Sequence, residues 1–155
     1  MRLFVYRYVF LVGLLSKTST LLAQSIQYIN PPGLLVSKGY TQVVVAQGGR
    51  TVYVSGQVSA NANGEILHKG DFQAQVRQVF DNLKTALAAA GATFSDVVKL
   101  TTYVVNSTDD KLNAVRSIRT QYYTGPNPPG STYVGVQALY DKDVLIEIEA
   151  IAVVR

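Results

Sequence analysis

The clearest hydrophobic pattern in the chain lies near its middle, where apolar residues recur at helical spacing. The residues that form this single stripe are Phe72, Val76, Val79, Phe80, Leu83 and Leu87. Asp71 precedes the stripe, and its carboxylate can accept hydrogen bonds from the free N–H groups of a first helical turn. Gly91 follows at the position where helices commonly end. The pattern therefore predicts a helix between Asp71 and Gly91.

Runs rich in β-branched residues predict strands on both sides of this helix. The predicted strands are residues 41–46, 51–54, 97–105, 132–138 and 144–154. Residues 47–50 (Gln-Gly-Gly-Arg) join the first two, and glycines there allow the positive φ angles of a tight hairpin. Residues 61–64 (Asn-Ala-Asn-Gly) form a second predicted turn.

A second helix is predicted after the strand at residues 97–105. Thr108 or Asp109 can cap it, and Leu112, Val115, Arg119 and Tyr122 are spaced along it. The Pro-rich residues 125–130 end this helix, because proline cannot continue it. The element order is thus β-β-α-β-α-β-β, which predicts a single α+β domain over residues 26–155.

The last predicted strand has two partly apolar faces. Period-2 alternation places Val144, Ile146, Ile148, Ala150 and Ala152 on one face, and Leu145, Glu147, Glu149, Ile151 and Val153 on the other. Two helices can cover only one face of a sheet of this size. We therefore expect the second face to pack against neighbouring chains in an oligomer.

The first 25 residues resemble an export signal. Arg2 and Arg7 precede a short apolar block at residues 8–15, and Ala23 and Ser25 have the spacing that signal peptidase recognises. We expect residues 1–25 to be a signal peptide and the protein to be exported, to the periplasm or outside the cell. The alternatives are an ordinary N-terminal strand, an uncleaved anchor or an organelle transit peptide; without a signal the protein would be cytoplasmic.

Composition and charge exclude several classes of function. The 155-residue chain has no cysteine and a single histidine, which excludes thiolate chemistry and argues against a histidine-based triad or metal site. The formal net charge is +4, but residues 26–155 contain eleven basic and ten acidic residues, so the excess belongs mainly to the N-terminal segment. A near-neutral domain does not favour nucleic-acid binding. Nothing in the sequence indicates a metal or other cofactor, or a membrane association once the signal is removed.

Three segments are similar to the RidA/YjgF family of small trimeric proteins. They are residues 53–58 (Tyr-Val-Ser-Gly-Gln-Val), residues 82–91 with 96–99, and residues 142–153 (Lys-Asp-Val-Leu-Ile-Glu-Ile-Glu-Ala-Ile-Ala-Val). The resemblance runs from about residue 28 to the end of the chain. It implies a chorismate-mutase-like α+β fold with the helices on one face of the sheet. It also implies a homotrimer whose sheets form a central barrel, with a small-molecule cleft at each subunit interface.

The resemblance further implies a chemistry, the hydrolysis of reactive imines and enamines to ketones and ammonia. Glu147 matches the family's glutamate, which helps to position the attacking water. Tyr40 matches a pocket tyrosine, and Ser55 with Gly56 matches a Ser-Gly pair. Tyr133 is also expected in the substrate pocket.

At two positions the chain departs from the deaminases of the family. Ser131 stands where they have an arginine that grips the substrate carboxylate, and Arg116 stands where they usually have asparagine. Replacing a bidentate guanidinium by one hydroxyl should cost about 1.5–3 kcal/mol of carboxylate binding. We hypothesise that Arg116 supplies the missing charge from another wall of the cleft.

Two functions therefore compete. One is an imine or enamine deaminase, favoured by Glu147 and the Ser55-Gly56 pair; the other is a non-catalytic trimer that binds a small metabolite, favoured by the missing arginine. The residues also have ordinary structural interpretations: Tyr40 can fill space, Gly56 can permit a bend in a strand, and Glu147 can pair with Lys or Arg. A ribonuclease activity is disfavoured by the charge balance.

Overall fold

The computed structural model describes residues 24–35, 37 and 39–155, so the predicted export signal lies almost entirely outside the described residues. The strands are β1 (Ser25–Ile29), β2 (Val43–Gln47), β3 (Arg50–Gln57), β4 (Val97–Val105), β5 (Gly130–Val136) and β6 (Ile146–Val154). The helices are α1 (Phe72–Ala89), the short 3-10 helix η1 (Phe94–Asp96) and α2 (Asp109–Arg119). Within these residues, no helix combines the length and apolarity needed to cross a membrane.

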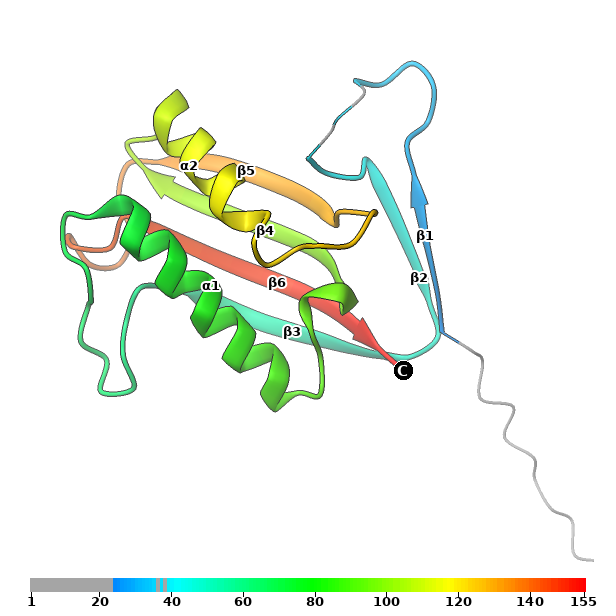
Figure 1. Ribbon diagram of the computed structural model, residues 1–155, viewed down its shortest axis with the longest axis horizontal. Helices are drawn as coiled ribbons and strands as arrows, with labels where there is room; N and C mark the ends of the chain where they lie inside the picture. The colour runs from blue at the N-terminus through cyan, green and yellow to red at the C-terminus, as the bar shows by residue number, and fades with distance from the viewer. Residues whose placement is uncertain (1–23, 36, 38) are drawn as a thin grey trace, which may run out of the picture.

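A four-stranded sheet in the order β3-β6-β4-β5 forms the centre of the domain. Strands β4 and β5 are parallel, and β6 is antiparallel to both of its neighbours. Helices α1 and α2 lie on the same face of this sheet (Figure 1), as expected. The register places Thr102 of β4 opposite Ile148 of β6 and Tyr133 of β5, so these three residues share a face.

The predicted hairpin between the first two strands is wrong, although both strands exist. β2 pairs with β1 in a separate two-stranded sheet, and β3 pairs with β6. Gly48 and Gly49 do adopt positive φ angles of 69° and 75°. At these two glycines the chain passes from one sheet into the other. Gly49 also packs closely against the end of β6, since a Cβ there would lie 2.5 Å from the Val154 carbonyl oxygen. Strand β1, whose first residue is Ser25, was not predicted.

The two helices begin as predicted, each with a side chain capping its first turn. Asp71 accepts a hydrogen bond from the Ala74 amide at 3.0 Å, and Thr108 accepts one from Lys111 at 3.3 Å. Gly91 follows α1 with a φ of 71°, as expected for a residue beyond a helix end. The apolar stripe of α1 is buried against the sheet; its fully buried members are Val76, Val79, Phe80, Leu83 and Leu87.

Strand β6 alternates as its sequence predicts. Ile146, Ile148 and Ala150 are at most 2% exposed and face the helices. Glu147, Glu149 and Ile151 are half-buried and point to the opposite face, which α1 and α2 leave uncovered (Figure 1). On the same open face, the Tyr53 side chain of β3 is 77% exposed. This is the face that we expect a second copy of the chain to cover.

Candidate functional site

The seven residues expected at the site fall into two groups on opposite faces of the sheet. Tyr40, Arg116, Ser131 and Tyr133 lie together on the helix side and line one cavity. Ser55, Gly56 and Glu147 lie on the open face, where Glu147 pairs in register with Tyr103 of β4. A single chain therefore does not bring the two groups together.

The cavity on the helix side has a volume of about 620 Å³. Helix α2, the start of β5 and the segment before β2 enclose it, and its floor includes Thr102 of β4. Its lining contains several hydroxyl groups and two arginines, Arg116 and Arg119, but no carboxylate. These features favour a small, negatively charged ligand with polar substituents.

Arg119 was not among the expected site residues, yet its guanidinium lies closest to Ser131. Its Nη1 donates to the Ser131 hydroxyl at 3.4 Å, and its Nη2 donates to the Gly39 carbonyl at 2.5 Å. Desolvation lowers the pKa of Arg119; Tyr123 opposes this effect and the neighbouring Arg116 adds to it. Arg116 itself is exposed.

A signal for Arg119 was present in the sequence. The spacing of the second helix puts position 119 on the same stripe as Leu112 and Val115, and Arg116 one residue off that stripe. The structure shows the consequence, since Leu112 and Val115 line the cavity together with Arg119. An arginine on the inward face of an amphipathic helix indicates a charge placed inside the domain, where it can serve a site.

On the open face, Gly56 makes room for the Glu147 side chain. A Cβ at position 56 would lie 2.6 Å from the Glu147 carboxyl carbon, and closer still to Oε1. The β3–β6 register shifts between Val54 and Gln57, so Ser55 and Gly56 occupy a bulge. The close approach of the Glu147 side chain thus favours glycine at this position.

Glu147 has no cationic partner among the residues that the structure describes. The ion pairs found there are Lys69–Asp143 and Lys142–Asp143, at 3.0 and 2.8 Å. The nearest polar neighbours on the open face include Tyr103, whose Oη donates to Glu149 Oε1 at 3.3 Å. The pKa of Tyr103 is raised, chiefly by desolvation and then by the negative charges of Glu149 and Glu147. The open face is therefore acidic around Tyr103, and Lys99 of β4 lines the adjoining groove together with Glu149 and Ser55.

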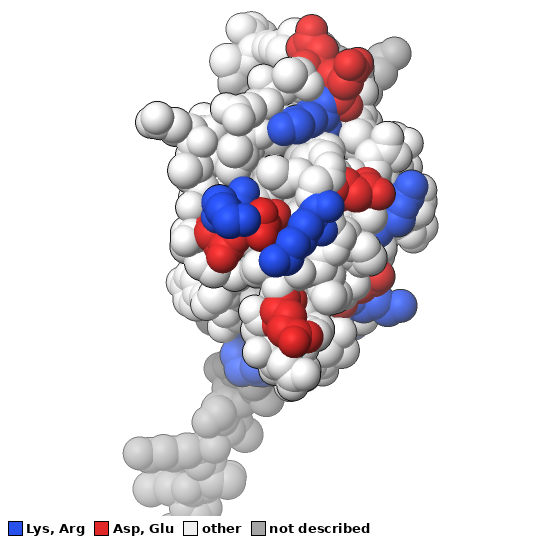
Figure 2. Space-filling view, turned by 90° about the vertical axis from the view of Figure 1, so that its left-hand side faces the viewer, with Lys and Arg blue, Asp and Glu red and all other residues white. Residues whose placement is uncertain are grey.

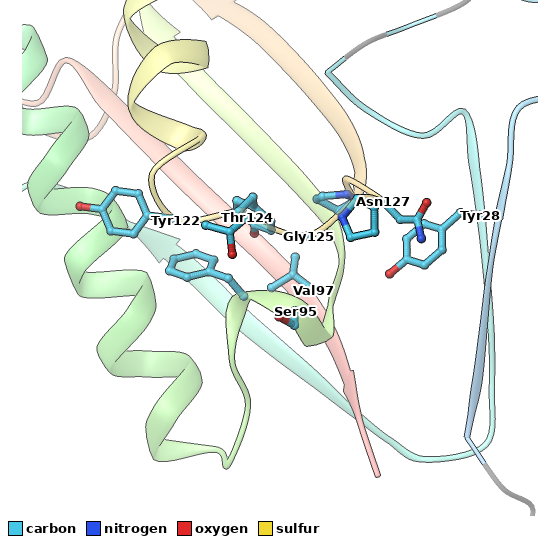
Figure 3. Close-up of a pocket in the computed structure, with 11 residues that line it drawn as sticks. Tyr28, Ser95, Val97, Tyr122, Thr124, Gly125 and Asn127 are labelled. Atoms are coloured by element: carbon cyan, nitrogen blue, oxygen red, sulfur yellow. The ribbon is translucent and has the colours of Figure 1, made fainter.

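A smaller cavity of about 200 Å³ lies between the loop after α2, η1 and β1 (Figure 3). Tyr122 lies at one end of it and Tyr28 at the other, and no charged residue lines it. Tyr122 stacks on Phe80 with ring centroids 4.9 Å apart, and Tyr123 packs against Phe94, so this tyrosine pair anchors the end of α2 in the core. Without a charge, this cavity is a poor candidate for binding a carboxylate.

Two observations concern the distribution of possible metal ligands and of charged side chains. Residues 24–35, 37 and 39–155 contain no group of three His, Cys, Asp or Glu side chains placed to hold a metal ion. On the face shown in Figure 2, basic and acidic side chains are interspersed. An interspersed pattern of this kind provides no continuous basic surface for a phosphate backbone.

Comparison with known proteins identifies the family. The family described as endoribonuclease L-PSP matches residues 33–154. A RutC family protein of Pyrococcus horikoshii is 42% identical over 115 residues, 73% of this chain and 85% of that protein. A Dermatophagoides farinae protein named 2-iminobutanoate/2-iminopropanoate deaminase is 36% identical over 116 residues, 75% of this chain and 86% of that protein.

Solved structures give the same result. A Rid-family protein of unknown function from Yersinia pestis has a TM-score of 0.78 and 43% sequence identity, covering 83% of this chain and 98% of that chain. The α+β arrangement of six strands and two helices is thus the expected chorismate-mutase-like fold. The chain belongs to the endoribonuclease L-PSP family, which is also called the RidA/YjgF or RutC family.

Proposed function

We propose that this protein is a hydrolytic imine deaminase, acting on small imines or enamines that carry a carboxylate. The observation that supports this most strongly is the separation of two complementary groups of residues. One face of the sheet carries a cavity with two arginines and no carboxylate, and the other carries Glu147, which has no cationic partner in the described part of the chain. The first group thus provides positive charge without a carboxylate, and the second provides a carboxylate without a cation.

A homotrimer is the arrangement that joins them. The family is typically homotrimeric, and the open face of the sheet, with its exposed Tyr53, is left without a cover in one chain. In the proposed trimer the open faces line a central barrel. The Glu147 group of one subunit then completes the cavity of the next subunit, which forms three equivalent clefts.

The proposed reaction needs only groups that this chain contains. The substrate carboxylate is held on the basic side of the cleft, and a water molecule lies between Glu147 and the imine carbon. Glu147 accepts a proton from the water as the water oxygen forms a bond to that carbon, and then passes this proton to the imine nitrogen to give a carbinolamine. Glu147 next accepts the hydroxyl proton of the carbinolamine and returns it to the nitrogen as the C–N bond breaks, so that one imine and one water give one ketone and one ammonia.

A second function is favoured by Ser131. This residue stands at the position of the deaminases' arginine, and it donates no charge to the cavity. On this alternative, the trimer binds a small carboxylate in the same clefts without hydrolysing an imine.

An assay of imine hydrolysis distinguishes the two functions. An amino-acid oxidase generates 2-iminobutyrate in situ, and the rate of keto-acid release is measured with and without the purified protein. We expect acceleration by the wild-type protein and its loss in Glu147→Gln, which keeps the size of the side chain but cannot accept the proton. Absence of acceleration with both charged and uncharged imines would leave only the binding function.

Mixing of inactive subunits tests whether the site is shared. Glu147→Ala trimers and Arg119→Gln trimers are each expected to be inactive. After unfolding and refolding a 1:1 mixture, about one quarter of the interfaces contain an intact residue from each side, if subunits associate at random. Activity near one quarter of wild type supports the shared cleft, and an inactive mixture contradicts it.

We also propose that residues 1–25 direct export and are removed. The basic start, the short apolar block and the small residues at 23 and 25 support this. Mass spectrometry of the protein recovered from cell fractions tests the proposal. An intact N-terminus in the cytoplasmic fraction would contradict it and support the cytoplasmic alternative.

A further inference from the structure

The cavity on the helix side contains an arginine whose charge is not neutralised by any described residue. Arg119 is half-buried in the last turn of α2, and no Asp or Glu of the described residues forms an ion pair with it. Its two hydrogen-bond acceptors, the Gly39 carbonyl and the Ser131 hydroxyl, are neutral. A partly buried guanidinium is normally matched by an anion. The described residues of one chain supply no such anion to Arg119, which leaves its guanidinium available to the carboxylate of a ligand.

The guanidinium has donors to spare for such a ligand. Arginine has five N–H donors, and the two contacts to Gly39 and Ser131 use two of them, the second at a long 3.4 Å. The segment before β2 closes tightly on the group, since a Cβ at Gly39 would lie 3.1 Å from Nη2. Arg119 is thus held in one orientation while part of its fork remains available. A fixed, planar fork is suited to bidentate binding of a carboxylate.

The guanidinium of Arg119 lies next to the position where the related deaminases have their carboxylate-binding arginine. Ser131 is the residue that replaces the carboxylate-binding arginine of the deaminases that the chain resembles, and Arg119 donates to its hydroxyl. Arg116, one turn away on the surface of the helix, is exposed and makes no hydrogen bond with Ser131. The charge lost from strand β5 is thus present at almost the same place, carried by a side chain of helix α2.

We propose that Arg119 binds the carboxylate of the ligand in this cavity and that Ser131 is small so that the guanidinium of Arg119 can reach the site. This proposal about Arg119 deepens the proposed function, and it rests on that function for the identity of the substrate. The binding of a carboxylate is independent of turnover and can be measured alone. It also replaces the hypothesis that Arg116 supplies the charge.

The test is a calorimetric titration of the purified full-length protein with 2-oxobutyrate, the stable keto acid. Arg119→Gln is expected to weaken binding roughly 10- to 100-fold, which is the scale of a lost hydrogen-bonded ion pair. Arg119→Lys should give an intermediate loss, because it keeps the charge but not the fork. Arg77→Gln, at an exposed position on α1, is the matched control and should change affinity less than threefold. The neutral amide of the keto acid should bind the wild type and Arg119→Gln equally weakly.

A second variant separates ligand binding from the tether to Gly39. In Arg119→Gln combined with Ser131→Arg, a guanidinium returns to the site from β5, and affinity should recover to within about threefold of wild type. Unchanged binding in Arg119→Gln, a larger loss in Arg116→Gln, or a loss that Ser131→Arg does not restore would each overturn the inference.

The outcomes also separate this inference from the proposed function. Wild-type protein that binds 2-oxobutyrate through Arg119 but does not accelerate imine hydrolysis would refute the enzyme and keep the inference. Wild-type protein and Arg119→Gln that hydrolyse 2-iminobutyrate equally well, with equal affinity for the keto acid, would refute the inference and keep the enzyme.

Discussion

Gly56→Ala tests whether the geometry around Glu147 matters for function. The new Cβ would lie 2.6 Å from the carboxyl carbon of Glu147 and 2.9 Å from its Cγ. Carbon atoms in contact are normally separated by about 3.5–4.0 Å. The end of the Glu147 side chain must therefore move by about 1 Å or adopt another rotamer.

The expected effect on activity is much larger than the effect on stability. A displacement of about 1 Å from the productive position of a catalytic group can cost about 100-fold in rate. A side chain forced away from its preferred rotamer lowers the free energy of unfolding by about 0.5–1.5 kcal/mol. Alanine makes the unfolded chain less flexible than glycine does, which raises the free energy of unfolding by about 0.4–1 kcal/mol and offsets much of that cost. We expect kcat/KM for 2-iminobutyrate to fall roughly 100-fold, with a free energy of unfolding within about 1 kcal/mol of wild type.

The measurements are imine hydrolysis and urea denaturation, with Gly125→Ala as the matched control. At Gly125 no atom lies within 4 Å of the position that a Cβ would occupy, and its φ is not positive, so this variant should retain full activity. In a Glu147→Ala background the clash disappears, and Gly56→Ala should then be neutral or slightly stabilising. Full activity in Gly56→Ala, or the same stability cost in both backgrounds, would refute the steric argument.

Three further predictions concern stability. Leu83→Ala should lower the free energy of unfolding by about 2–5 kcal/mol in urea denaturation, because the side chain is fully buried. Asp71→Ala should cost about 1 kcal/mol through loss of the α1 cap, whereas Lys84→Ala, at an exposed position of the same helix, should cost little. Burial, followed by the hydrogen bond to Asp81, raises the pKa of Tyr122 to about 12. Its contribution to stability should therefore be complete below pH 10 and lost between about pH 10 and 12, and Tyr122→Phe should make that decline less steep.

The elements with strong local signals were predictable from the sequence. Helix α1 has an uninterrupted apolar stripe, a capping aspartate and a terminal glycine, and each of these signals acts within a few residues. Strand β6 alternates so regularly that both of its faces could be assigned. The resemblance to a known family then placed the helices on one face of the sheet.

Strand pairing was less predictable, because it depends on residues far apart in the chain. The runs around β2 and β3 are strands, but nothing local to residues 47–50 indicates that β2 pairs with β1 and β3 with β6. A Gly-Gly turn suits a hairpin and a change of sheet equally well. Strand β1 is only five residues long and begins where the predicted signal ends, so its alternation is too short to give a clear signal.

If Arg119 binds the ligand as proposed, it illustrates why a comparison of aligned positions can miss a charge that the site retains. An alignment compares backbone positions, whereas a ligand is bound by the ends of side chains. Arginine is long enough for its guanidinium to reach a site on the neighbouring strand, and here Arg119 of α2 reaches Ser131 of β5. Helical periodicity does indicate that residue 119 faces inward, but not how far its side chain extends or which strand lies opposite. The structure supplies that information, since Ser131 and Tyr133 of β5 line the same cavity as Arg119 of α2. Loss of an arginine at one position is therefore weak evidence that this family member has lost its affinity for carboxylates, until the side chains on the facing helix have been considered.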